Sequence, residues 1–136
     1  MDLKNEKVKN LEFIQNIISR MASNSLELKK LTVTIITGIT VFLTIQTTKN
    51  YLILTLLLPT IIFGLLDAYY LNLERKYREL YKQALNDLNY EPFDLNACTE
   101  EINKQYPYCS AVFSTSIMPF YLTIIISILI YYLCLK

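Results

Sequence analysis

Three long runs without a charged residue constrain this chain more than any other feature of its sequence. Leu31 to Thr48 holds 18 consecutive uncharged residues, Tyr51 to Leu66 holds 16, and Gln105 to Leu135 holds 31. A helix needs about 20 apolar residues to cross a hydrocarbon core of about 30 Å. A chain of 136 residues is too short to bury three such segments as a soluble helical bundle. We therefore expect an all-α integral membrane protein with three transmembrane helices.

The charged residues between these runs predict the orientation of the chain. Eleven of the 13 Lys and Arg lie before residue 31 or between residues 72 and 110, and the other two are Lys49 and Lys136. Because positive residues are enriched on the cytoplasmic side of a membrane, we expect a multi-pass inner-membrane protein with a cytoplasmic N-terminus and an outside C-terminus. The expected segments are a cytoplasmic amphipathic helix at 1–30, transmembrane helices at 31–48 and 51–71, a cytoplasmic helical extension at 72–88, a cytoplasmic loop at 89–110 and a third transmembrane helix at 111–135.

Two segments outside the predicted spans have helical periodicity. Residues 9–24 place apolar side chains on one face and polar side chains on the other, as in an amphipathic helix. The second span is expected to continue as one helix to about Asp87, and its apolar seam is the natural partner of that face. A loop with one short helix around 98–104 should follow. The two apolar faces are Leu11, Ile14, Ile18 and Met21, and Tyr70, Leu73, Tyr77, Leu80 and Ala84.

The composition argues against enzymatic chemistry. The chain has no His, which removes the commonest general base and the usual nucleophile pairs and zinc ligands. Cys98, Cys109 and Cys134 form no C-x-x-C motif, so we expect reduced thiols, no metal and no cofactor. The formal charge of +1 indicates no global attraction to nucleic acid.

A stripe of threonines runs along the first predicted span. Thr37, Thr40, Thr44 and Thr47 share one helical face. Polar groups inside a membrane tend to face an aqueous cavity, so these residues are candidates for lining a pore between subunits. The alternative is that each hydroxyl bonds the carbonyl four residues earlier or a neighbouring helix.

Asp67 is the one ionisable residue within the predicted spans. A carboxylate at such a depth costs free energy unless it is hydrated or paired. It is a second candidate for the pore lining, as a cation-attracting ring around an axis. The alternative is an ion pair with Lys29 or Lys30 at the start of the first span.

Basic residues on the extension of the second span are candidates for binding phosphate. Arg75, Arg78 and Lys82 are expected on one face, with Tyr81 available to stack on a base. The alternative is a solvated helix stabilised by opposite-charge pairs four residues apart, such as Glu74 with Arg78.

The stretch EFIQNIISRMASNSLELKK, residues 12–30, comes directly before the predicted membrane hairpin. It resembles small bacterial membrane proteins in which Phe-Ile-Gln-x-Ile-Ile-x-Arg-Met-x-x-Asn-Ser precedes the first span, in particular membrane effectors of Hailong-type anti-phage systems. The resemblance implies a homo-oligomeric ion channel, a tetramer, controlled by a nucleotide-derived ligand such as a DNA oligomer from a partner nucleotidyltransferase. Arg20 then joins the candidate ligand site. The residues that carry the resemblance are Phe13, Ile14, Gln15, Arg20, Met21, Asn24 and Ser25.

Two functions follow as hypotheses. The first is an oligomeric channel, because three spans in one chain cannot enclose an aqueous path and several copies must surround an axis. The second is a non-conducting anchor whose cytoplasmic helices recruit a soluble partner.

Overall fold

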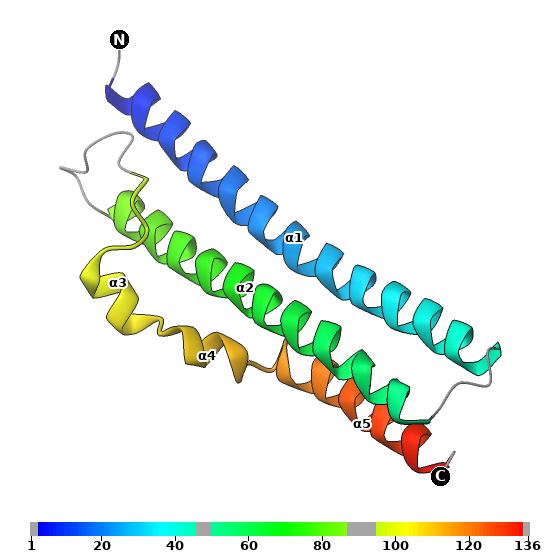
Figure 1. The fold of residues 1–136 in the computed structure, drawn as a ribbon. Helices are drawn as coiled ribbons and strands as arrows, with labels where there is room; N and C mark the ends of the chain where they lie inside the picture. The colour runs from blue at the N-terminus through cyan, green and yellow to red at the C-terminus, as the bar shows by residue number, and fades with distance from the viewer. Residues whose placement is uncertain (1–2, 46–49, 87–94, 135–136) are drawn as a thin grey trace.

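The computed structural model describes residues 3–45, 50–86 and 95–134, and every regular element in these residues is a helix. Two long helices, α1 and α2, form an antiparallel hairpin, and three shorter helices return along α2 toward the turn of the hairpin (Figure 1). The elements are α1 (Leu3–Ile45), the 3-10 helix η1 (Asn50–Leu56), α2 (Leu57–Asn86), α3 (Glu100–Gln105), α4 (Tyr108–Val112) and α5 (Met118–Cys134).

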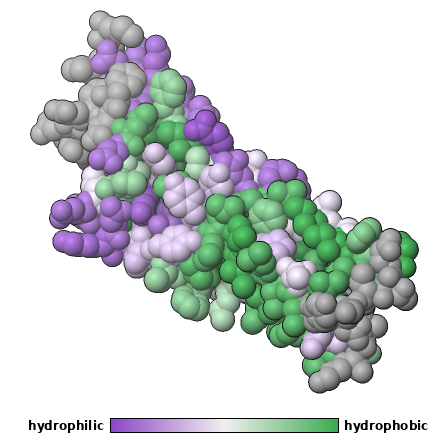
Figure 2. Space-filling model, in the orientation of Figure 1, coloured by the Kyte–Doolittle hydropathy of each residue, from purple (hydrophilic) through white to green (hydrophobic). Residues whose placement is uncertain are grey.

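The molecule is polar at one end and apolar at the other (Figure 2). We call residues 31–45, 50–66 and 118–134 the apolar half; these residues contain no Asp, Glu, Lys or Arg. Two helical segments, Asn5–Ile45 and Leu52–Asn86, are long and apolar enough to cross a membrane, and α5 is a shorter apolar helix. The all-helical prediction is confirmed for the described residues.

The expected cytoplasmic helix and first span form one continuous helix. α1 runs for 43 residues without a break at residue 30, which at 1.5 Å per residue is about 65 Å. No Pro lies in α1, and its first Gly is Gly38, so the sequence offers no helix breaker at the point where composition changes. Residues 46–49, which include Thr47, lie outside the described part of the chain.

The other two expected spans begin with irregular turns. The segment from Asn50 to Leu56 is a 3-10 helix, and α2 places Pro59 in its first turn, where an amide hydrogen is not required. α5 begins at Met118 rather than at residue 111, because Pro119 again suits a first turn. The Ser114 carbonyl accepts the amide of Met118 at this start.

Three apolar clusters hold the helices together. At the polar end Ile14 and Ile18 of α1 pack with Leu80 and Ala84 of α2 and Ile102 of α3, which confirms the predicted pairing of the two amphipathic faces. The short helix α3 lies where one was predicted, and α2 continues to Asn86 as expected. The second cluster joins α2, α4 and α5, and the third joins η1 to α5; they contain Ala68, Ala111, Ile117 and Tyr121, and Ile53, Leu56 and Ile128.

We expect opposite effects on stability when a methyl group is added at each of the two glycines. A Cβ at Gly38 meets nothing within 4 Å, whereas a Cβ at Gly64 lies 3.3 Å from Cγ of the Tyr121 ring. We expect Gly38→Ala to raise the free energy of unfolding by about 0.5–1 kcal/mol, the usual helix preference for Ala over Gly. Gly64→Ala is expected to lower it, because the buried Tyr121 ring must move. Thermal unfolding followed by circular dichroism measures both, and equal shifts for the two variants contradict this account of the α2–α5 contact.

Candidate functional site: an ion pair between α1 and α2, and the polar stripe of α1

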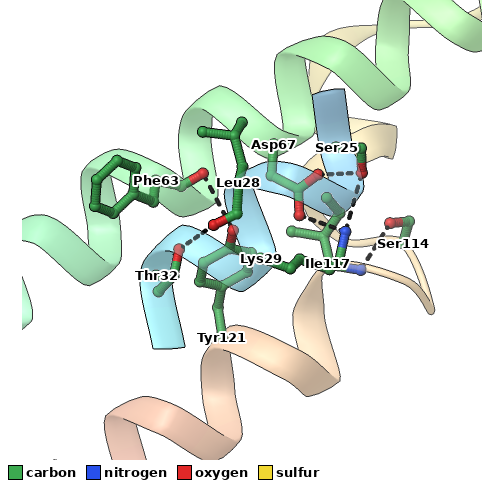
Figure 3. A network of polar contacts seen from close by, with 9 residues as sticks. All are labelled: Ser25, Leu28, Lys29, Thr32, Phe63, Asp67, Ser114, Ile117 and Tyr121. Carbon is green, nitrogen blue, oxygen red and sulfur yellow. Dashed lines mark hydrogen bonds and ion pairs between the residues drawn. The ribbon is translucent and has the colours of Figure 1, made fainter. Parts of the chain in front are cut away.

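A buried ion pair joins α1 to α2 at the boundary of the apolar half (Figure 3). Lys29 Nζ lies 2.5 Å from Asp67 Oδ2, and Asp67 is fully buried. Lys29 also donates to Ser25 Oγ at 3.0 Å, and Ser25 Oγ donates to Asp67 Oδ1. Ser25 and Lys29 are four residues apart on α1, so both reach the same carboxylate.

The start of α5 lies against this ion pair. Tyr121 packs on Gly64, and its hydroxyl donates to the Phe63 carbonyl at 3.3 Å. On the α1 side Thr32 is buried and donates to the Leu28 carbonyl at 2.7 Å (Figure 3). Residues from three helices therefore surround one buried charge pair.

The structure shows Asp67 in one of its two expected roles, the ion pair with the start of the first span. The partner is Lys29 and not Lys30, which lies on the exposed side of the helix and pairs with Glu27. Asp67 has no exposed surface, and its ion pair with Lys29 lies within the single chain.

A polar stripe runs along the side of α1 that is opposite to its buried face. Its members recur every three or four residues, all are exposed, and Val41 is the one apolar residue in the register. The buried face across the helix contains Ile14, Ile18, Ser25 and Thr32. The stripe continues into the apolar half, where Thr37 borders a hollow shared with α5 and Thr44 hydrogen-bonds Tyr131 of α5. The polar stripe consists of Glu12, Asn16, Ser19, Ser23, Glu27, Lys30, Thr34, Thr37 and Thr44.

The threonine hydroxyls of α1 bond the backbone of their own helix. Thr34 donates to the Lys30 carbonyl, Thr40 to the Ile36 carbonyl and Thr44 to the Thr40 carbonyl, at 3.0, 2.7 and 2.8 Å. These bonds, each to the carbonyl four residues earlier, are the ones that the alternative interpretation of the threonines predicted. A hydroxyl that donates in this way keeps its lone pairs, so the exposed Thr34 remains able to accept from water.

A hollow of about 350 Å³ separates α1 from α5 in the apolar half. Thr37 and Thr40 contribute from α1, and the opposite wall contains Thr123, Ser127 and Tyr131 of α5. Tyr131 also hydrogen-bonds Thr44, with 2.6 Å between the two hydroxyl oxygens. Sequence reasoning did not connect the hydroxyls of α5 with those of α1. The spacing of Thr123 and Ser127, four residues apart, was the available signal.

The basic residues expected to bind a ligand have partners within the chain. Arg78 pairs with Glu74 at 2.5 Å, as the alternative interpretation predicted. Arg75 instead donates to the carbonyl and hydroxyl of Ser110, at 3.1 and 3.3 Å.

Lys82 and Arg20 complete the expected basic set. Lys82 donates a hydrogen bond to Glu79 at 3.1 Å. This hydrogen bond and the negative charge of Glu79 raise the pKa of Lys82. Arg20 is exposed on α1.

Tyr81 lies beside a second hollow, at the polar end. This hollow has a volume of about 440 Å³, and α1 supplies the rest of its lining: Val8, Leu11, Glu12, Gln15 and Asn16. Tyr81 is thus beside open space, but the hollow is not lined by Arg20, Arg75, Arg78 or Lys82. The structure does not bring the five candidate ligand residues together in one pocket.

Asn10 is a buried polar residue that sequence reasoning missed. Its side chain is 1% exposed, and neither its amide nitrogen nor its oxygen has a hydrogen-bond partner among the described residues. Asn10→Leu is expected to raise the free energy of unfolding by about 1–3 kcal/mol, the cost of burying an unsatisfied polar group. Chemical unfolding followed by circular dichroism measures this, with the exposed Asn5→Leu as control. A destabilised Asn10→Leu protein contradicts the expectation.

Groups of three or more His, Cys, Asp or Glu that could hold a metal ion are not found among the described residues. The three cysteines are exposed free thiols. Comparison with protein-family models, with curated proteins and with solved structures finds no match.

Proposed function

We propose that this chain is the subunit of an oligomeric membrane ion channel, a tetramer, that acts as an effector in bacterial anti-phage defence. The polar stripe of α1 carries the proposal. Nine exposed polar side chains at helical spacing form a line from the polar half into the apolar half, on the side of α1 opposite to its buried face. At the apolar end of this line Thr44 contacts Tyr131 of α5. Several copies with this side turned toward a common axis enclose a polar path.

The membrane placement follows from the contrast between the apolar half and the other described residues, which we call the polar half. We place the apolar half in the hydrocarbon core, with α1, α2 and α5 as the three spans. The 17 residues of α5 rise about 25 Å at 1.5 Å per residue, close to the thickness of that core. The polar half, which holds most of the Lys and Arg, lies in the cytoplasm. The ion pair of Lys29 with Asp67 then lies at the cytoplasmic boundary of the inner membrane.

The buried ion pair supports a path along α1 rather than along α2. Because Lys29 pairs with Asp67 inside each subunit, Asp67 presents no free charge to an axis. Thr34, Thr37 and Thr44 remain exposed on α1, and these hydroxyls line the membrane part of the path.

Control by a nucleotide-derived ligand is the part of the proposal that the resemblance of residues 12–30 supports. α1 is one continuous helix of 43 residues, so its cytoplasmic part, where a ligand would bind, and the threonines of the stripe belong to the same element. Arg20 is exposed, and Tyr81 borders an open hollow. The ligand is an oligonucleotide made by a partner nucleotidyltransferase.

Two measurements on purified protein test this proposal. Native mass spectrometry in detergent should show a single oligomer, a tetramer. Ion flux from liposomes should change when oligonucleotide is added, and the change should weaken in Arg20→Gln but not in Lys104→Gln, an exposed control on α3. A monomer in detergent and in lipid, with liposomes that stay tight, contradicts the channel and favours a non-conducting anchor.

A further inference from the structure

Two adjacent lysines on α1 have different surroundings. The Lys29 side chain is 18% exposed and is held by the fully buried Asp67. The Lys30 side chain is 60% exposed and pairs with Glu27, whose side chain is 65% exposed, at 2.8 Å. Neighbouring residues on a helix point about 100° apart, so Lys29 faces α2 while Lys30 belongs to the polar stripe.

The position of Lys30 on the stripe is distinctive. It is the last charged residue before the uncharged segment Leu31–Ile45, and Thr34, Thr37 and Thr44 follow it along the stripe. Glu27 lies one turn farther from the apolar half. Any ion that moves along the stripe toward the threonines therefore passes the carboxylate first and the ammonium second.

We propose that Lys30 and Glu27 form two successive rings of charge at the cytoplasmic mouth of the path and set its selectivity. This inference rests on the proposed channel and names the residues that select the ion. Rings of basic side chains favour anions, and rings of acidic side chains favour cations. Lys30 is nearer to the low-dielectric membrane, where charges interact more strongly, so its ring dominates and the path prefers anions. Glu27 weakens that preference by pairing with Lys30.

Single substitutions distinguish the effect of the Lys30 ring on ion selectivity from that of the Glu27 ring. In planar bilayers with a potassium chloride gradient, the reversal potential of the wild type should lie toward the chloride equilibrium value. Lys30→Gln should lower the chloride-to-potassium permeability ratio several-fold, and Glu27→Gln should raise it. Both side chains are exposed, so both variants should keep the helical circular dichroism of the wild type. Lys104→Gln removes the same charge from exposed α3 and should leave the ratio unchanged.

A charge exchange gives the sharpest form of the test. Glu27→Lys combined with Lys30→Glu keeps an ion pair and the net charge but places the carboxylate nearer to the membrane. The path should then prefer potassium. A current whose selectivity is the same in the wild type, in Lys30→Gln and in the exchanged protein overturns this inference and leaves the channel intact. If folded wild-type protein in lipid passes no current, the proposed function fails, and this inference fails with it.

Discussion

Asp67→Leu is expected to lower the free energy of unfolding by about 3–5 kcal/mol, because it leaves the Lys29 ammonium without its partner in a buried position. Ser25, which donates to the same carboxylate, loses its acceptor as well. Purified Asp67→Leu protein should unfold at a markedly lower temperature by circular dichroism, or should fail to accumulate as a folded species.

The double variant Lys29→Met with Asp67→Leu provides the control. Replacing both members of a buried ion pair by apolar side chains of similar size is often neutral or stabilising. The double variant should therefore recover most of the stability that Asp67→Leu loses. If the single and double variants are equally unstable, the loss arises from packing at residue 67 and not from an unpaired charge.

Replacing Thr34, Thr37 and Thr44 together by Val is expected to reduce ion flux by at least about tenfold. Val has the shape of Thr without its hydroxyl, so the path loses three groups that bind water, and α1 also loses the hydrogen bond between Thr44 and Tyr131. Each lost hydrogen bond is worth about 0.5–1.5 kcal/mol, and about 1.4 kcal/mol corresponds to a factor of ten. Flux from liposomes that contain equal amounts of folded protein measures the effect.

Two other exposed threonines supply the matched controls for this variant. Thr55 of η1 and Thr123 of α5 also bond carbonyls of their own segments, at 2.6 and 2.7 Å, but they lie off the polar stripe. Thr55→Val and Thr123→Val should conduct as the wild type does. If the Thr123 variant loses as much flux as the triple variant, the path follows the hollow between α1 and α5 instead of the stripe.

The pairing of α1 with α2 could be predicted from the sequence because it depends on local periodicity. Ile14 and Ile18 on one helix and Leu80 and Ala84 on the other recur at helical spacing, and the structure packs them together. The ion pair could also be predicted from the sequence, because burial of a lone carboxylate is costly and few lysines lie near the start of the first span. The choice of Lys29 over Lys30 depended on which side of α1 meets α2.

Features that depend on tertiary neighbours were not predicted. The division of the third apolar run into α4 and α5 depends on a turn around Ser114 and Pro119, which hydropathy does not detect because the turn is itself uncharged. The partner of Arg75 proved to be Ser110 of α4 rather than a residue of its own helix. The polar stripe recurs in the sequence at a spacing of three and four residues, but only the structure shows that its members, such as Glu12 and Ser23, are exposed.

The most direct test of the channel is the current through a planar lipid bilayer that contains purified wild-type protein. We expect discrete current steps of uniform size, because a fixed number of subunits surrounds one path, and smaller steps from the triple Thr-to-Val variant. Protein that is shown to be folded and inserted, but that gives no steps above those of protein-free lipid, contradicts the proposed channel.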